Sequence, residues 1–355
     1  MGHHRILGRV PYEPPQDPRQ ARRTAIWRWV SFVMALSLVA LVAYLAYLGY
    51  DGSQTFAMHA RSGDCRTPAS EFGWPYEAIN YDLASDSELD AFPDRTECPR
   101  PGEEAGDALT ASDGIRIAGW YIPAGNQSEA APTIVLAHGN GKTKSEMLSW
   151  AEPLHAEYNL VLFDFRNHGQ SSGDVTTLGV REVRDLQAVV DWLERTKAPP
   201  AIAVLGVSMG GAAAVDEAAT DDRVSAVILD STHATLVSAL QAQLESRGLP
   251  LALPGAWSIL LGGLLRTGED LSVADPIQAI AHIGDRPVLI VAAGDDDAVG
   301  PTDAADLMTA GLGDGARVEL KTCPAAAHGG SVVTCSSDYA SWVLGFLERS
   351  LPHGP

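Results

Sequence analysis

The sequence predicts an α/β protein with a mostly parallel central sheet, helices on both faces, a small helical cap and an N-terminal transmembrane helix. Three observations predict this architecture. Short apolar runs typical of buried strands alternate with helix-period segments between residues 107 and 350. Residues 231–275 interrupt that alternation with an apolar insertion. Residues 30–50 form an uncharged, strongly apolar stretch that precedes all of it.

The first element is the apolar stretch at residues 30–50. At about 1.5 Å per residue, a helix of this length crosses roughly the 30 Å hydrocarbon core of a bilayer. Trp27 and Trp29 lie at its start and Tyr50 at its end, where aromatic rings favour the membrane interface. We therefore expect an uncleaved anchor with the lipid bilayer as partner. The alternatives are a cleaved signal peptide, although the stretch exceeds the usual apolar length of about 7–15 residues, and a buried core helix.

Charge predicts the orientation of this anchor and excludes one class of partner. Residues 1–50 contain six Arg and two acidic residues, a net +4, so the remainder of a chain of net charge −20 carries −24. The Arg-rich flank precedes the apolar stretch, which predicts a cytoplasmic tail at residues 1–29 and an extracytoplasmic main domain. A surface so acidic repels phosphate backbones, so nucleic acid is not an expected partner.

Cysteine usage agrees with an exported domain. The four cysteines, Cys65, Cys98, Cys323 and Cys335, all follow the apolar stretch, and none forms a C-x-x-C pair. An even number in an oxidising compartment suggests two disulfides with three possible pairings. We prefer the local pairing, Cys65 with Cys98 and Cys323 with Cys335. The alternative is four free thiols in a cytoplasmic protein.

The remaining elements follow in chain order. Residues 51–106 show weak periodicity and read as a linker and N-terminal extension. Residues 107–350 then form the main domain, beginning with a hairpin of 108–111 and 115–122 around Gly114. Six short apolar runs predict the later strands: Thr133–Ala137, Asn159–Phe163, Ala201–Leu205, Val224–Leu229, Val288–Ala292 and Val318–Leu320. The insertion at about 231–275 predicts a cap over the substrate entrance, or else a helix on the outer face of the sheet.

The strongest local motif is Gly206-Val207-Ser208-Met209-Gly210, which follows a predicted strand and opens an Ala-rich helix. In that context a G-x-S-x-G sequence predicts a serine held on a tight strand-to-helix turn, with its hydroxyl above the sheet. The helix N-terminus favours a developing oxyanion nearby. Ser208 is therefore the candidate nucleophile.

A serine nucleophile needs a base, and the base needs an acid that orients it. His328 follows the last predicted strand among small residues and is the candidate base, whereas structural roles are expected for His138 and His168. The acid is expected after the strand 288–292, where three consecutive Asp lie at 295–297. We prefer Asp297, with Asp296 second and Asp230 an outside candidate.

The oxyanion that forms during attack requires two backbone N–H donors. Met209, the residue after the nucleophile, is the expected source of one. The loop His138-Gly139-Asn140-Gly141 follows the first central strand, and Asn140 is the expected source of the other. An ordinary Gly-rich turn is the alternative for this loop.

These motifs, together with Asp164-Phe165-Arg166-Asn167-His168-Gly169 and His328-Gly329, resemble the α/β-hydrolase superfamily in its order of Ser, acid and His. The resemblance covers roughly residues 105–350, and the run from Gly119 to Pro123 resembles the esterase and peptidase-like branch. It implies Ser-His-Asp acyl chemistry on a small-molecule ester or other acyl substrate, with no cofactor and no metal.

The function expected from this resemblance is hydrolysis of carboxylic esters or thioesters. A peptidase of the same fold and a non-catalytic, membrane-anchored binding protein are the alternatives. Because Cys323 and Cys335 bracket His328 in the sequence, a bond between them is also expected to hold the loop of the base in register.

Overall fold

The computed structural model describes residues 18–58, 66–79, 109–126, 128 and 130–351. The chain divides into two compact units, one ending at Tyr47 and the other beginning at Leu48. The expected Cys65–Cys98 bond and most of the expected N-terminal extension lie outside the described residues.

The first element is helix α1, Pro18–Ala57, which runs without interruption through the apolar stretch. It contains a segment, Arg22–Ala57, that is long and apolar enough to cross a membrane. A helix of this kind near the N-terminus fits both an anchor and a signal sequence, so membrane insertion stays a prediction. The expected boundaries were too narrow, because the helix begins at Pro18 within the predicted tail and continues to Ala57 within the predicted linker.

The second unit is built on one sheet of eight strands in the order β1-β2-β4-β3-β5-β6-β7-β8. Strands β3 to β8 run parallel, whereas β2 is antiparallel to both β1 and β4. The fold class predicted from the apolar runs is confirmed. The strands are β1 Glu77–Ile79, β2 Gly119–Ile122, β3 Thr133–Ala137, β4 Asn159–Phe163, β5 Ile202–Val207, β6 Val224–Asp230, β7 Pro287–Ala293 and β8 Arg317–Cys323.

The edge of the sheet differs from the expected hairpin. Thr110 and Arg116 form only an isolated bridge, and the edge strand is β1, which comes from the segment predicted to be a linker. Strand β1 has only three residues, and the first of them is exposed. The alternation of apolar and polar residues is therefore too short to predict a strand from the sequence.

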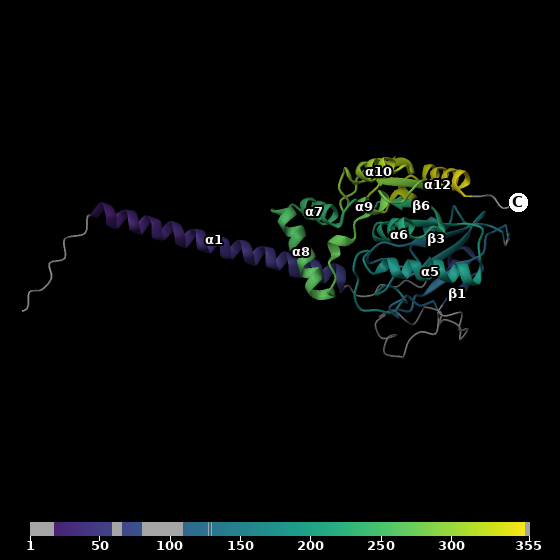
Figure 1. The fold of residues 1–355 in the computed structure, drawn as a ribbon, viewed down its shortest axis with the longest axis horizontal. Helices are drawn as coiled ribbons and strands as arrows, with labels where there is room; N and C mark the ends of the chain where they lie inside the picture. Colours follow the sequence, from purple (N-terminus) through teal and green to yellow (C-terminus); the bar gives the residue numbers. More distant parts are fainter. Residues whose placement is uncertain (1–17, 59–65, 80–108, 127, 129, 352–355) are drawn as a thin grey trace, which may run out of the picture. The chain divides into compact units, whose positions relative to one another are not determined.

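Helices cover both faces of the sheet. On one face α5 and α6 lie side by side with α9 and α10 (Figure 1). On the other, α4, α11 and α12 enclose a core that includes alternate residues of the central strands, as the twofold period of a strand requires. These helices are α4 Leu148–Ala151, α5 Glu182–Thr196, α6 Met209–Thr220, α9 Pro276–Ile280, α10 Asp303–Asp314, α11 Ser331–Thr334 and α12 Ser336–Ser350, and the short α2, Pro68–Phe72, precedes β1.

The insertion after β6 forms helices α7, Leu236–Ser246, and α8, Ala252–Thr267, followed by a 3₁₀ turn at Leu271–Val273. Helices α7 and α8 pack on each other, and a capping box at Thr235 and Ser238 begins α7. The last ten residues of α1 belong to the same unit, where the Ala57 carbonyl accepts a hydrogen bond from Thr176 N at 3.1 Å. The predicted cap is therefore two helices, and the end of α1 lies with them.

Candidate active site

Ser208 occupies the turn between β5 and α6 in a conformation that few residues adopt. Its φ of 55° and ψ of −117° place it outside the allowed helix and strand regions. The turn is enforced by crowding, because a Cβ on Gly206 would lie 2.2 Å from the Gly210 carbonyl oxygen, and one on Gly210 would lie 2.2 Å from the Ala137 oxygen. Only glycine fits at both positions, which explains why this local sequence folds into a sharp turn.

The structure brings Ser208 and His328 into hydrogen-bond contact. The hydroxyl of Ser208 donates to Nε2 of His328 at 2.9 Å, and Nδ1 of His328 donates to the carboxylate of Asp296 at 2.9 and 3.0 Å. The imidazole is thereby held in the tautomer that leaves Nε2 free to accept a proton. This arrangement can deprotonate the serine as it attacks a carbonyl carbon.

The expectation that Asp297 orients the base is wrong, because Asp296 occupies that place. The Asp296 carboxylate accepts hydrogen bonds from Ala298 N and Val299 N, both at 2.9 Å, which turns it inward toward His328. The side chains of Asp295 and Asp297 are exposed. Asp296 was the second choice from the sequence, where three adjacent carboxylates offered no means of ranking their directions.

The loop of the acid and the loop of the base are joined by their backbones. Gly294 N donates to the Cys323 carbonyl at 2.8 Å, and Asp295 N donates to the Ala326 carbonyl at 2.9 Å. A Cβ on Gly294 would lie 2.2 Å from the Pro324 carbonyl oxygen, so only glycine permits this approach. Asp296 and His328 therefore meet because the two loops that carry them are paired.

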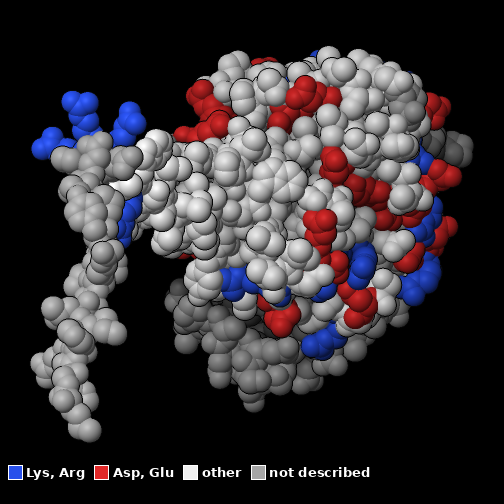
Figure 2. Space-filling model, turned by 60° about the vertical axis from the view of Figure 1, so that its left-hand side comes forward, with Lys and Arg blue, Asp and Glu red and all other residues white. Residues whose placement is uncertain are grey.

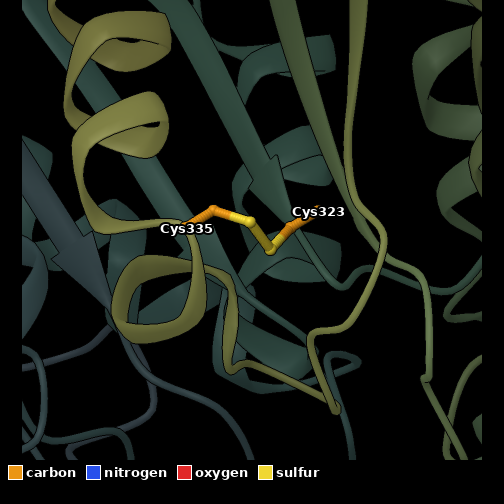
Figure 3. Close-up of a disulfide and its surroundings, with 2 residues drawn as sticks. All are labelled: Cys323 and Cys335. Carbon is orange, nitrogen blue, oxygen red and sulfur yellow. A yellow bond between two sulfur atoms is a disulfide. The ribbon is translucent and has the colours of Figure 1, made fainter.

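A disulfide closes the loop of the base. Cys323 at the end of β8 is bonded to Cys335, which precedes α12, and the two Cα atoms lie 6.1 Å apart (Figure 3). This confirms one of the two expected bonds. His328 lies within the closed loop, so the bond ties the end of the sheet to the helix that follows the base.

A third support for His328 comes from Asp230 and Ser231 at the end of β6. Ser231 Oγ accepts a hydrogen bond from Gly329 N at 3.0 Å and donates to Asp230 Oδ1 at 3.1 Å. The fully buried Asp230 also accepts from Trp150 and Tyr339. Its burial raises the pKa of the carboxyl, and these donors partly offset that effect. Asp230 thus supports the base loop through Ser231, whereas the carboxylate that contacts His328 is that of Asp296.

Sequence reasoning placed Asp230 as an alternative acid and missed Ser231. The available signal was position, since both residues end a parallel strand at the edge where active sites form in such sheets.

The loop expected to complete the oxyanion hole is fixed by two buried histidines. His138 Nδ1 donates to the Gly139 carbonyl at 2.7 Å, and its Nε2 accepts from Phe165 N at 3.0 Å. His168 Nε2 accepts from Gly141 N at 2.9 Å. These bonds agree with the structural roles expected for both histidines. The Gly141 N–H is engaged by His168, and Asn140 and Met209 both line the pocket of Ser208, so Asn140 stays the predicted second donor of the oxyanion hole.

A pocket opens beside Ser208, with a volume of about 800 Å³ that includes the open solvent at its mouth. Met209 and Asn140 line it together with the nucleophile, and α7, α8 and the end of α1 supply most of its wall. Sequence reasoning did not anticipate that residues 51–56 reach this site. The apolar lining is Phe56, Leu178, Met209, Leu236, Ala239, Leu240, Leu244, Ile259, Ala298 and Val299.

One polar group in this wall has no partner among the described residues. His233 is 4% exposed, and its Nε2 makes no hydrogen bond. Burial, together with the nearby His328, lowers the pKa of His233 to about 4, so the ring is neutral at physiological pH. A neutral imidazole nitrogen in the pocket can hydrogen-bond a polar group of a bound substrate.

Comparison with known proteins agrees with the fold. Residues 132–254 match the family model described as the alpha/beta hydrolase fold. Esterase Pf2001 of Pyrococcus furiosus has a similar structure, with a TM-score of 0.62 over 82% of this chain and 97% of that one, at 21% sequence identity. At such identity the likeness concerns the fold alone.

Two curated relatives are more similar in sequence but say little about activity. YfhR of Escherichia coli K12, an uncharacterised protein, is 31% identical over 49% of this chain and 61% of its own length. Bem46 of Schizosaccharomyces pombe is 26% identical over 68% of this chain and 76% of its own. The matched part of this chain thus spans about six tenths of the E. coli relative. The chain therefore has the α/β-hydrolase fold.

Proposed function

We propose that this protein is a serine hydrolase that cleaves carboxylic esters through an acyl-enzyme, and that α1 anchors it in a membrane. The observation that carries the proposal is the continuous chain of hydrogen bonds from Ser208 through His328 to Asp296. Ser208, at the first end of this chain, lines the pocket. A lone serine hydroxyl is a weak nucleophile, and this chain supplies both the base and the group that orients it.

The reaction proceeds in two steps. Ser208 attacks the ester carbonyl while His328 takes its proton, and the Met209 and Asn140 N–H groups stabilise the oxyanion. His328 then protonates the departing alcohol. Water, deprotonated by the same imidazole, attacks the acyl-enzyme and releases the acid. The apolar wall of the pocket favours an apolar acyl group.

The test is covalent labelling by a fluorophosphonate probe, which reacts with activated serines. The full-length protein should be labelled, and the Ser208→Ala variant should not be. Ser331→Ala is a matched control, since Ser331 is a fully buried serine three residues after the base. Labelling that persists in Ser208→Ala contradicts the proposal, because a residue other than Ser208 is then the reactive nucleophile. Absence of labelling from the folded wild type also contradicts it, and favours a non-catalytic binding protein.

A further inference from the structure

The cap helix α8 exposes an apolar stripe to its surroundings. Within the described residues outside α1, six of the ten exposed large apolar side chains lie between residues 251 and 265, each 40–79% exposed. Five of them, at positions 253, 257, 261, 264 and 265, follow helical spacing along one side. They are Leu251, Leu253, Trp257, Leu261, Leu264 and Leu265. We call these six residues the α8 stripe. A contiguous apolar surface of this kind marks an interaction site.

The opposite side of α8 is buried against the protein, so the stripe is not needed for its packing. Ala256, Ile259 and Leu260 are buried, and Ile259 lines the pocket of Ser208. The only charged residue of α8 is Arg266. Its guanidinium donates to Ser53 Oγ at 2.8 Å and to the Tyr50 carbonyl at 3.2 Å. Helix α8 is thus apolar on both sides, as a helix between a protein core and an apolar medium would be.

The contacts of α8 place it next to the end of the predicted membrane span. A Cβ on Gly262 would lie 2.3 Å from the Gly49 carbonyl oxygen, and one on Gly49 would lie 2.5 Å from the Ser258 oxygen. Glycines on both helices therefore let the two backbones approach closely, as in helix packing in membranes. Gly49 falls in the last turn of the apolar stretch 30–50. If that stretch spans a bilayer, α8 must lie at the interface.

We propose that the α8 stripe inserts into the surface of the same bilayer that holds α1, and that the pocket takes its ester substrate from that bilayer. The inference rests on the proposed esterase function and on the anchor. It deepens both by identifying the substrate as an ester with a long apolar acyl chain that resides in a membrane. Trp257 in the stripe is the residue type that favours the interfacial region.

The charge distribution favours a neutral or zwitterionic lipid surface. Residues 51–355 carry a net charge of −24. Helix α8, at the left of the globular unit in Figure 1, is turned forward in Figure 2, which shows a broad uncharged area with acidic side chains above it and both basic and acidic side chains below it. Insertion of the α8 stripe is therefore driven by apolar burial, and anionic lipid should not strengthen it.

The pocket lies directly beneath this surface. Ile259 of α8 and Asp51, Thr55 and Phe56 of α1 belong to the same wall as Ser208. Ile259 lies on the buried side of α8, opposite the α8 stripe, so the same helix contacts both the pocket and the proposed bilayer surface. The ester group can then lie at Ser208.

The first test measures bilayer contact without depending on activity. Full-length protein is reconstituted in phosphatidylcholine vesicles, with and without brominated acyl chains, which quench tryptophan only on close approach. The brominated lipid should quench an emission component that is missing from the Trp257→Phe variant. Unquenched Trp257 emission overturns the proposal, and if it accompanies a dimer in the membrane, the α8 stripe is an interface between two copies of this chain.

The second test compares two esters in the same vesicles. In Leu261→Glu/Leu265→Glu, hydrolysis of a bilayer-embedded long-chain acylglycerol should fall at least tenfold, while hydrolysis of soluble p-nitrophenyl acetate stays within twofold. Leu312→Glu, at an exposed apolar site on α10, is the matched control and should change neither. Equal loss with both esters, or no loss, overturns the proposal. Quenching of Trp257 without any Ser208-dependent hydrolysis would instead leave docking intact and refute the esterase function.

Discussion

Asp296 and Asp297 are neighbours with the same functional group, yet they lie in different surroundings. The carboxylate of Asp296 is held by two backbone N–H groups and receives Nδ1 of His328, whereas Asp297 is exposed. Ser208 and His328 were predictable because a motif or a position after a strand identifies each. The choice between adjacent acids depends on loop dihedral angles, which residue types do not determine.

We predict that Asp296→Asn lowers kcat for ester hydrolysis by about 10³-fold or more, because the amide no longer holds the base in the productive tautomer. Asp297→Asn is the matched control and should change kcat by less than about twofold, since an exposed carboxylate contributes little to the site. The measurement is steady-state hydrolysis of a soluble ester. A larger loss in Asp297→Asn than in Asp296→Asn would restore the assignment made from the sequence.

His233 predicts a specific dependence of stability on pH. Its pKa falls from 6.5 to about 4 on folding, so between these values the unfolded chain binds a proton that the folded protein excludes. The free energy of unfolding is therefore unaffected by His233 above about pH 6.5, and it decreases as the pH falls from there toward 4. Between pH 6 and pH 5 the loss is about 1 kcal/mol. In His233→Gln the decrease in Tm over that interval should be smaller, and an unchanged decrease would contradict the assignment.

At the scale of elements, the site depends on close approach between loops and helices. The acid and base loops pair through Gly294, the Ser208 turn requires Gly206 and Gly210, and α8 meets α1 through Gly49 and Gly262. The sequence shows that these glycines are present, but it does not show which distant backbone each one faces. That is why the elements were predictable while their contacts were not.

We predict that Gly294→Ala separates Asp296 from His328, because the added Cβ would overlap the Pro324 carbonyl. The fluorophosphonate labelling rate should fall at least tenfold, and overpacking should cost about 1–3 kcal/mol of stability. Gly313→Ala on α10 is the control, because a Cβ there meets nothing within 4 Å. That change should be neutral or stabilising by up to about 1 kcal/mol. Normal labelling of Gly294→Ala would show that the two loops are not coupled.

The Cys323–Cys335 bond carries a prediction of its own. By the chain-entropy model, closing a loop of this length contributes about 3 kcal/mol. The Cys323→Ala/Cys335→Ala variant should have a lower Tm, and its labelling rate should fall even at temperatures where circular dichroism shows a folded protein. Equal labelling rates in variant and wild type would show that the bond stabilises the fold without holding the loop of His328 in position.

At the scale of the whole molecule, the α/β fold and its mostly parallel sheet follow from the apolar runs, as predicted. Three local features did not: the continuation of α1 to Ala57, the edge strand at 77–79, and the participation of residues 51–56 in the pocket. Residues 51–57 are mostly polar or small, so their helix depends on packing within the second unit, to which they belong, and only the tertiary structure reveals that packing.

One helix contains the predicted span and also lines the pocket of the candidate nucleophile. Residues 48–57 therefore connect the predicted span to the pocket of the candidate nucleophile.

The most direct test of the central claim is to trap the acyl-enzyme. Full-length protein turning over a p-nitrophenyl ester is quenched in acid, digested, and analysed by mass spectrometry. The account predicts one acyl group per chain, on the peptide that carries Ser208, and none in Ser208→Ala. An acyl group on a different residue, or ester hydrolysis with no Ser208-bound intermediate, would contradict it.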